Sequence, residues 1–249
     1  MSRAGRTALA LGLIASLATG AALAAGDAPQ PDIRAQLSPV RSTVLSTEIP
    51  GRVADLTVRE GDRFTEGQRL VQFDCTVHKA RLDKALAQQQ QARKSHQVHA
   101  RLDKLGSNSA LEYETSAAQL AGAEAEVAMM RAMVERCSVN APFAGRVVEL
   151  KVKRHQYLAE GHELLEILDD REMEVEMVVP SRWLPWLTPG YPFALRLDET
   201  RKEYPAKVVR TGARIDPVSQ SVKVFGTVDG RFPELVAGMS GSAVMQPPQ

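Results

Sequence analysis

Cysteine and aromatic residues are both scarce in this sequence. Two of its 249 residues are cysteine and 5% are aromatic, a content that suits extended, thinly cored modules better than one large globular core. The sequence also lacks a Cys-x-x-Cys pair, a glycine-rich phosphate loop and any Ser/His/Asp constellation. We therefore predict that the protein is not an enzyme, has no catalytic or cofactor-binding residues, and uses neither a metal nor another cofactor.

Neither sign of charge dominates the chain. The formal net charge is +1 and charged residues make up 24% of the sequence, without a block of basic residues. Proteins that bind nucleic acid usually carry a basic patch or stripe that meets the phosphates. The charge pattern therefore argues against a nucleic-acid partner and fits an ordinary soluble surface.

A long apolar run occurs only at the N-terminus. Two arginines precede an Ala-rich apolar stretch over residues 9–23, and Ala-Leu-Ala at residues 22–24 provides a small-x-small cleavage site. We predict a signal peptide over residues 1–24, whose removal changes the net charge to −1 because two arginines and no acidic residue are lost. An uncleaved N-terminal anchor is the alternative, but Gly, Ser and Thr interrupt the apolar run. The mature protein is expected to be exported.

Residues 75–137 form the stretch around which the chain is organised. It contains no proline, its glycines are Gly106 and Gly122, and it is rich in Ala, Gln, Leu, Glu, Lys and Arg, which favour helix. The Gly-Ser-Asn-Ser run at residues 106–109 signals a turn. The pattern predicts two antiparallel helices of about 30 residues, a hairpin about 45 Å long at 1.5 Å per residue.

The second helix of this hairpin has a regular apolar pattern. Alternating steps of three and four residues connect the positions of the expected seam: Tyr113, Ser116, Leu120, Ala123, Val127, Met130, Val134 and Cys137. Such a pattern is typical of coiled-coil packing. The first helix is less regular, since its candidates Leu82, Ala85, Leu86 and Ala92 are interrupted by residues 88–91, His96 and His99. A hairpin this polar suggests a partner that completes its packing.

The segments on either side of the hairpin repeat each other. Residues 51–74 and 145–168 share eight identities in 24 positions, which indicates a duplication. Each copy alternates apolar and polar residues around a Glu-Gly pair, and this pattern is typical of β-strands with glycine turns. We expect the repeat turns at Gly51, Gly67, Gly145 and Gly161. The two half-motifs, residues 38–74 and 138–169, are expected to face each other in a flattened sandwich.

The hairpin leaves one half of this sandwich and returns at the start of the other half. This arrangement brings Cys75 and Cys137 together at the root of the hairpin, although they lie 62 positions apart. In an oxidising compartment we predict a disulfide between them. The alternative is two reduced cysteines buried in the core.

Short alternating segments fill residues 170–249. Turn signals separate them: Pro-Gly at 189–190, Asp-Pro at 216–217, Asp-Gly at 229–230 and Ala-Gly at 237–238. Several short strands with regular turns predict a small antiparallel β-barrel. Residues 25–37 are expected to form a leader followed by a first barrel-associated strand.

Residues 141–147 read Ala-Pro-Phe-Ala-Gly-Arg-Val and resemble the APFDGxV signature of HlyD-type periplasmic adaptor subunits, the membrane fusion proteins of tripartite efflux pumps and secretion systems. Residues 237–239, Ala-Gly-Met, resemble the "PGM" turn of that family. The resemblance covers residues 38–245 and implies an elongated, modular α+β fold. In that fold a split lipoyl-like β-sandwich is interrupted by an α-helical coiled-coil hairpin and followed by a small antiparallel β-barrel.

The resemblance also implies a function and partners. Family members dock onto a TolC-like outer-membrane channel through the hairpin tip, where Arg101, Leu102, Leu105 and Ser109 match the family's motif. The gap between Leu105 and Ser109 is shorter than in the better-known members. The expected role is that of a periplasmic adaptor between an inner-membrane transporter, with the RND type favoured, and this channel. The adaptor exports small molecules, associates with the inner membrane through its transporter and assembles as six copies.

Other readings of the same residues are less well supported. Carrier domains of lipoyl-like fold attach lipoate or biotin to a lysine at a hairpin tip, but here the helical insert occupies that place. His96 and His99 could share a metal, and Met129, Met130 and Met133 could offer soft ligands. The alternative function is therefore a periplasmic metal- or ligand-binding protein that delivers cargo to a pump. Arg101 and Lys104 could also be ordinary solvated helix charges.

Overall fold

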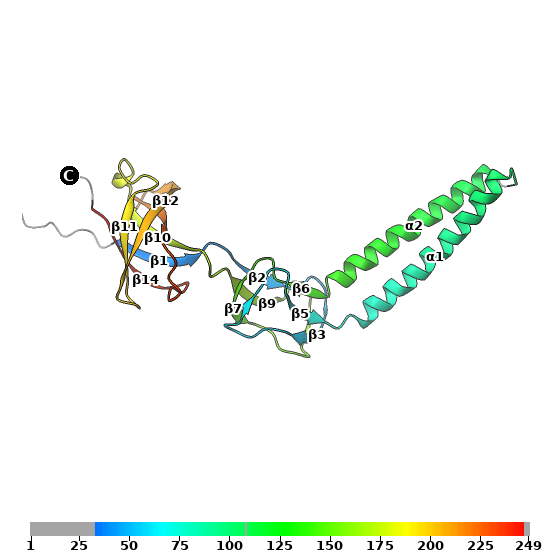
Figure 1. The fold of residues 1–249 in the computed structure, drawn as a ribbon, viewed down its shortest axis with the longest axis horizontal. Coiled ribbons are helices and arrows are strands. Elements are labelled where there is room, and N and C mark those ends of the chain that lie inside the picture. Colours follow the sequence, from blue (N-terminus) through cyan, green and yellow to red (C-terminus); the bar gives the residue numbers. More distant parts are fainter. Residues whose placement is uncertain (1–32, 108, 247–249) are drawn as a thin grey trace, which may run out of the picture. The chain divides into compact units, whose positions relative to one another are not determined.

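The computed structural model describes residues 33–107 and 109–246. These residues form a closed β-barrel, two small β-sheets and a pair of long helices (Figure 1). The predicted signal peptide over residues 1–24 and the leader up to residue 32 lie outside the described residues.

The two small sheets make up the sandwich. One sheet has the order β2 (Ser42–Ser46), β9 (Glu163–Leu168), β7 (Gly145–Leu150), β4 (Arg63–Phe64), and the other has the order β6 (Ser138–Asn140), β5 (Arg69–Phe73), β3 (Gly51–Leu56), β8 (Tyr157–Leu158). Strand β4 of the first repeat pairs with β7 of the second, and β8 of the second repeat pairs with β3 of the first. The two halves therefore exchange short strands, so that each sheet contains strands from both repeats.

Apolar positions shared by the two repeats form the core of this sandwich. Three pairs of repeated residues are buried: Val53 and Val147, Val58 and Val152, and Leu70 and Leu164. Their burial at matching positions of the two copies explains why these positions keep the same residue type, since a change of volume in a packed core is costly.

The repeated glycines have two different roles. Gly67 and Gly161 lie in turns and have φ angles of 75° and 80°. The expectation of turns at Gly51 and Gly145 is wrong, because these residues begin strands β3 and β7. At Gly145 the reason for glycine is a close backbone approach: an added Cβ atom would lie 2.0 Å from the carbonyl oxygen of Leu168.

Helices α1 (Thr76–Lys104) and α2 (Ala110–Glu135) lie side by side and run antiparallel (Figure 1). All eight seam positions expected for the second helix are buried or half-buried. On α1 the expectation for Leu86 is wrong, since this side chain is 38% exposed. The polar residues Gln89, His96 and His99 are instead half-buried at the seam spacing. Heptad position, rather than hydrophobicity, decides which residues of α1 face α2.

A disulfide joins Cys75 and Cys137 where the helices meet the sandwich. Their Cα atoms are 6.0 Å apart, within the usual range for a disulfide, and both residues are buried. The predicted disulfide is thus confirmed, and it closes the base of the helix pair.

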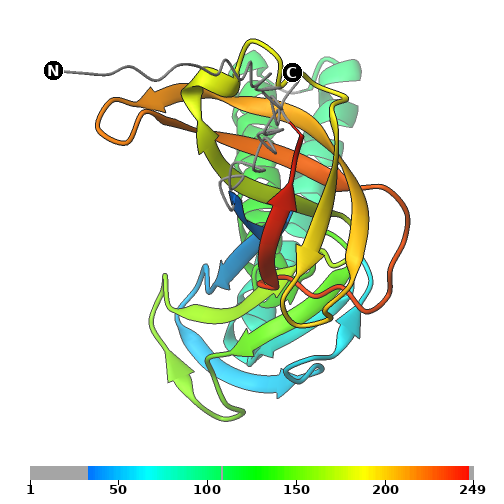
Figure 2. The same cartoon turned by 90° about the vertical axis from the view of Figure 1, so that its left-hand side faces the viewer.

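The barrel contains six antiparallel strands in a closed order (Figure 2). In that order they are β1 (Ile33–Pro39), β10 (Met173–Pro180), β13 (Ser221–Val228), β12 (Glu203–Asp216), β11 (Pro192–Leu197) and β14 (Ser240–Val244), and a short 3-10 helix (Ser181–Trp183) follows β10. Strand β1 precedes the sandwich in sequence but closes the barrel between β10 and β14. The Ala-Gly-Met turn binds β1 as well, since Gly238 N–H donates to the Leu37 carbonyl at 2.8 Å.

Candidate partner-docking site

The tip of the helix pair is bounded by two well-formed caps. At the end of α1, Gly106 N–H donates to the Asp103 carbonyl and Ser107 N–H donates to the Leu102 carbonyl, both at 2.9 Å. With Gly106 at a φ of 66°, these two bonds make a Schellman motif. The chain therefore ends one helix with a defined turn before it starts the next, and the residues beside the turn are held in place.

Ser109 begins α2 as its N-cap. Its hydroxyl accepts a hydrogen bond from Glu112 N–H at 3.2 Å, and Ser109 N–H donates to the Glu112 carboxylate at 3.0 Å. This reciprocal pair is a capping box. Hydrogen bonds from the Ser109 backbone and then from its side chain lower the pKa of Glu112. The hydroxyl expected to contact a channel therefore has a structural partner within its own chain.

The other expected tip residues differ in exposure. Leu105 is 75% exposed and Arg101 is also exposed, whereas Leu102 is half-buried. The sequence interpretation missed Leu111, which is 76% exposed at the start of α2. The heptad pattern could have revealed it, because Leu111 and Ala118 lie seven residues apart and both fall at a position that faces away from the seam.

A polar cluster lies in the seam below the tip. His96 Nδ1 is 3.0 Å from the Ser116 hydroxyl, and the His96 ring lies 5.2 Å from the Tyr113 ring, centroid to centroid. Ser116 is buried. Within residues 33–107 and 109–246 there is no group of three or more His, Cys, Asp or Glu side chains arranged to hold a metal ion. The geometry gives His96 a role in packing the two helices together.

A buried carboxylate lies where the chain passes between sandwich and barrel. Asp169 is 1% exposed, and its two oxygens accept hydrogen bonds from Nε and Nη2 of Arg171, each at 2.8 Å. Arg41, in the other connection between the two modules, donates to the same carboxylate at 2.5 Å. The Arg171 guanidinium holds the pKa of Asp169 well below its usual range. The Asp169 carboxylate therefore links the two segments that connect the sandwich and the barrel.

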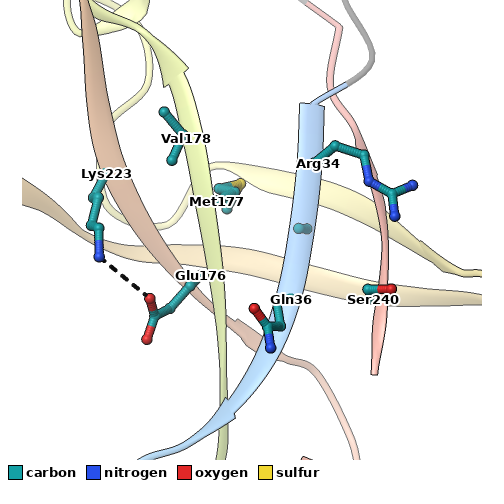
Figure 3. A pocket seen from close by; sticks show the side chains of 8 residues that line it. Arg34, Gln36, Glu176, Met177, Val178, Lys223 and Ser240 are labelled. Atoms are coloured by element: carbon teal, nitrogen blue, oxygen red, sulfur yellow. Dashed lines mark ion pairs between the residues drawn. The ribbon is translucent and has the colours of Figure 1, made fainter. Parts of the chain in front are cut away.

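A surface hollow of about 320 Å³ lies against strands β1, β10, β13 and β14 of the barrel (Figure 3). Charged side chains around it pair with one another: Arg34 with Asp198 at 3.0 Å, and Lys223 with Glu176 at 3.8 Å. In Figure 3 Arg34 lies on the opposite side of β1 from the Lys223–Glu176 pair. These groups do not converge on a common point.

Within residues 33–107 and 109–246, neither long helix combines the length and the apolar character that a membrane crossing requires.

Barrel-sandwich hybrid folds are defined by two β-sheets that exchange strands, with a helix pair inserted between the two halves. A match to the family described as "RND MFP, barrel-sandwich hybrid domain" covers residues 41–170, more than half of the chain. The chain therefore belongs to the family of RND membrane fusion proteins.

Two individual proteins are similar to the chain in sequence. The chain is 27% identical over 192 residues to an uncharacterized protein of Haemophilus influenzae, covering 77% of this chain and 50% of the relative. It is 25% identical over 218 residues to the nodulation protein NolF of Rhizobium meliloti, covering 82% of this chain and 59% of the relative. The chain thus spans half of the length of the first relative and 59% of the length of the second.

Solved structures share the fold. A MacA–MexA chimeric protein with the α-hairpin domain of Pseudomonas aeruginosa MexA superimposes with a TM-score of 0.76 at 16% identity, covering 85% of this chain and 78% of the other. At this identity the likeness concerns the fold alone.

Proposed function

We propose that the protein is a periplasmic adaptor of the HlyD type, which links an inner-membrane transporter of the RND class to a TolC-like outer-membrane channel for the export of small molecules. In this role it resides in the periplasm, is held at the inner membrane by its transporter and acts as an assembly of about six copies. The function is mechanical, with no chemical step.

The observation that carries this proposal is the exposed apolar tip of the helix pair. Leu105 is exposed beside the Schellman motif that ends α1, and Leu111 is exposed beside the capping box that begins α2. Large apolar side chains held at the end of a helix pair are suited to insertion between the helices of a partner. Arg101, exposed one turn before Leu105, adds a group that can hydrogen-bond to backbone carbonyls or carboxylates at the same contact.

Site-specific crosslinking tests the docking step. Leu105→Cys and Leu111→Cys variants, each with the native disulfide intact, are expressed with the channel in cells and treated with a short thiol–amine crosslinker. Both variants should link to the channel. Val218→Cys, at an exposed turn of the barrel (92% exposed), is the matched control and should not link. If the tip variants link no more than this control, the proposed function is wrong.

A further inference from the structure

Two adjoining segments form the end of the barrel that is not joined to the sandwich. Strand β1 ends and β10 begins at the joined end, because each adjoins a connection to the sandwich. Residues 181–191 follow the other end of β10, and the turn over residues 214–221 lies beside them, since Ser181 N–H donates to the Gln220 carbonyl at 2.8 Å. We call these two segments the aromatic end of the barrel.

Both tryptophans of the chain lie in the first of these segments. The Trp183 and Trp186 rings are 5.1 Å apart, centroid to centroid, and the Trp186 and Tyr191 rings are separated by the same distance. Trp183 is buried in the barrel core, whereas Trp186 and Tyr191 are half-buried. Tryptophan and tyrosine combine an apolar ring with a polar group, and they are enriched at membrane–water interfaces for this reason.

The second segment holds an apolar side chain in solvent. The register of β12 with β11 ends at Lys207, whereas its register with β13 continues to Asp216, so the β12–β13 hairpin extends beyond the barrel (Figure 2). The Asp216 carboxylate accepts hydrogen bonds from the N–H groups of Val218 and Ser219, at 3.0 and 2.9 Å. In the turn fixed by these bonds, Val218 is 92% exposed and Ile215 is 47% exposed. A preorganised apolar tip loses little conformational freedom when it enters a partner.

The aromatic end is also basic. Arg182 and Arg214 are exposed there, and Asp216 is the one acidic residue of the two segments. Arg34 of the barrel pairs with Asp198 at 3.0 Å, whereas Arg182 and Arg214 have no ion-pair partner within residues 33–107 and 109–246. Guanidinium groups without a carboxylate partner can donate hydrogen bonds to the phosphates of lipid headgroups.

We infer that the aromatic end of the barrel binds the surface of a bilayer that contains anionic phospholipid. The occupant is a lipid surface because it provides three complementary environments within a few ångströms of depth. Its acyl region accepts an apolar side chain such as Val218, its interface accepts the rings of Trp186 and Tyr191, and its anionic headgroups attract arginine. The inference goes beyond the proposed function, in which the transporter alone holds the protein at the membrane.

Tryptophan fluorescence tests this contact directly, because both tryptophans of the chain lie at the aromatic end. The protein purified from cells is titrated with vesicles of phosphatidylcholine, with and without phosphatidylglycerol. Vesicles that contain phosphatidylglycerol should shift the emission to shorter wavelength, and brominated acyl chains in them should quench it. Binding to phosphatidylcholine alone should be weaker by roughly fivefold for each arginine. Unchanged emission, together with no sedimentation of the protein with phosphatidylglycerol vesicles, overturns the inference.

Charge variants at the two ends of the barrel provide a matched comparison. Arg182→Gln/Arg214→Gln should weaken binding to phosphatidylglycerol vesicles roughly 25-fold. Arg201→Gln/Arg231→Gln removes the same charge from exposed positions in loops at the end joined to the sandwich, and it should bind nearly as the unmodified protein does. Equal weakening in the two double variants overturns the inference, because net charge rather than the aromatic end would then be responsible.

An apolar pair of variants tests the insertion of the tip. Val218→Ser should weaken vesicle binding about tenfold and reduce the quenching by brominated lipid. Val236→Ser is the matched control, since Val236 is 51% exposed in the loop between β13 and β14, at the end joined to the sandwich. Both positions are exposed, so both variants should fold. Binding by Val218→Ser that equals that of the control contradicts the insertion.

Inner-membrane vesicles distinguish a lipid surface from a membrane protein as the occupant. Binding to these vesicles that is absent from vesicles of their extracted lipids overturns the inference and assigns the aromatic end to a protein partner. The lipid experiments contain neither transporter nor channel, so their failure leaves the tip-to-channel crosslinks and the adaptor function in place. Vesicle binding without tip-to-channel crosslinks overturns the adaptor function alone.

Discussion

The turn before β8 contains a histidine in a conformation that favours glycine. His155 has a φ of 68°, and the equivalent residue of the first repeat is Gly61, with a φ of 82°. Both turns are held by the same type of bond to the other repeat: His155 N–H donates to the Val53 carbonyl at 2.8 Å, and Gly61 N–H donates to the Val147 carbonyl at 2.9 Å. The fold therefore imposes this backbone conformation on both residues.

Replacing His155 by glycine should stabilise the sandwich. A non-glycine residue in the left-handed region costs about 1–2 kcal/mol, and glycine loses about 0.4–1 kcal/mol more on folding because its unfolded chain is freer. The imidazole is exposed, so its removal loses little packing. The net expectation for His155→Gly is a stabilisation of about 0.5–1 kcal/mol. The reverse change, Gly61→His, should destabilise by a similar amount, since nothing lies within 4 Å of the added Cβ atom.

Hydrogen exchange gives a readout confined to the sandwich. Amides of the buried strands β5 and β9 should exchange about two- to fivefold more slowly in His155→Gly, the factor that this free energy implies. His155→Ala keeps the unfavourable φ and should leave exchange nearly unchanged. Equal slowing in the glycine and alanine variants would refute the reasoning, because the imidazole rather than the backbone would then be responsible.

Three further predictions follow from the same structure. Gly145→Ala should destabilise the sandwich by about 1–3 kcal/mol in urea unfolding, whereas Gly51→Ala, whose Cβ would lie 3.4 Å from Phe73, should cost less. The lowered pKa of Asp169 stabilises the folded state above pH 4, and this stabilisation is lost as the pH falls below 4. Asp169→Asn should therefore flatten the pH dependence of the urea unfolding midpoint in that acidic range. Ser109→Ala should cost about 1 kcal/mol and speed amide exchange in the first turn of α2, and Ser109→Asp should retain the cap.

The sequence was informative where one physical requirement acted on many positions. The repeat was visible because Val53, Val58 and Leu70 have buried counterparts of the same type one repeat later. The seam of α2 was visible because its period of 3.5 residues continues without interruption. The cysteine pair could be placed because both ends of the hairpin had to return to the same sandwich.

The features that were missed depend on neighbours distant in sequence. Strands β4 and β8 are two residues long and exchange between the repeats, which no local pattern reveals. Gly145 is required by the Leu168 carbonyl, 23 positions away. On α1, hydrophobicity favoured Leu86, but the seam follows heptad position and contains His96, whose partner Ser116 lies on the other helix.

The distribution of burial also bears on how the helix pair is stabilised. Within α1 and α2 the buried residues are Ala85, Ser116 and Val127, all small or medium in size, whereas the sandwich buries aromatic and large aliphatic side chains together with the disulfide. Because stabilisation scales with the apolar area removed from water, the shaft gains little from its own seam. The root fixes the start of both helices, and most side chains along the two helices remain exposed, so contacts with a partner would add packing along their length. We therefore expect the helix pair to become more resistant to unfolding when the protein assembles, because each neighbour covers side chains that are exposed in a single chain.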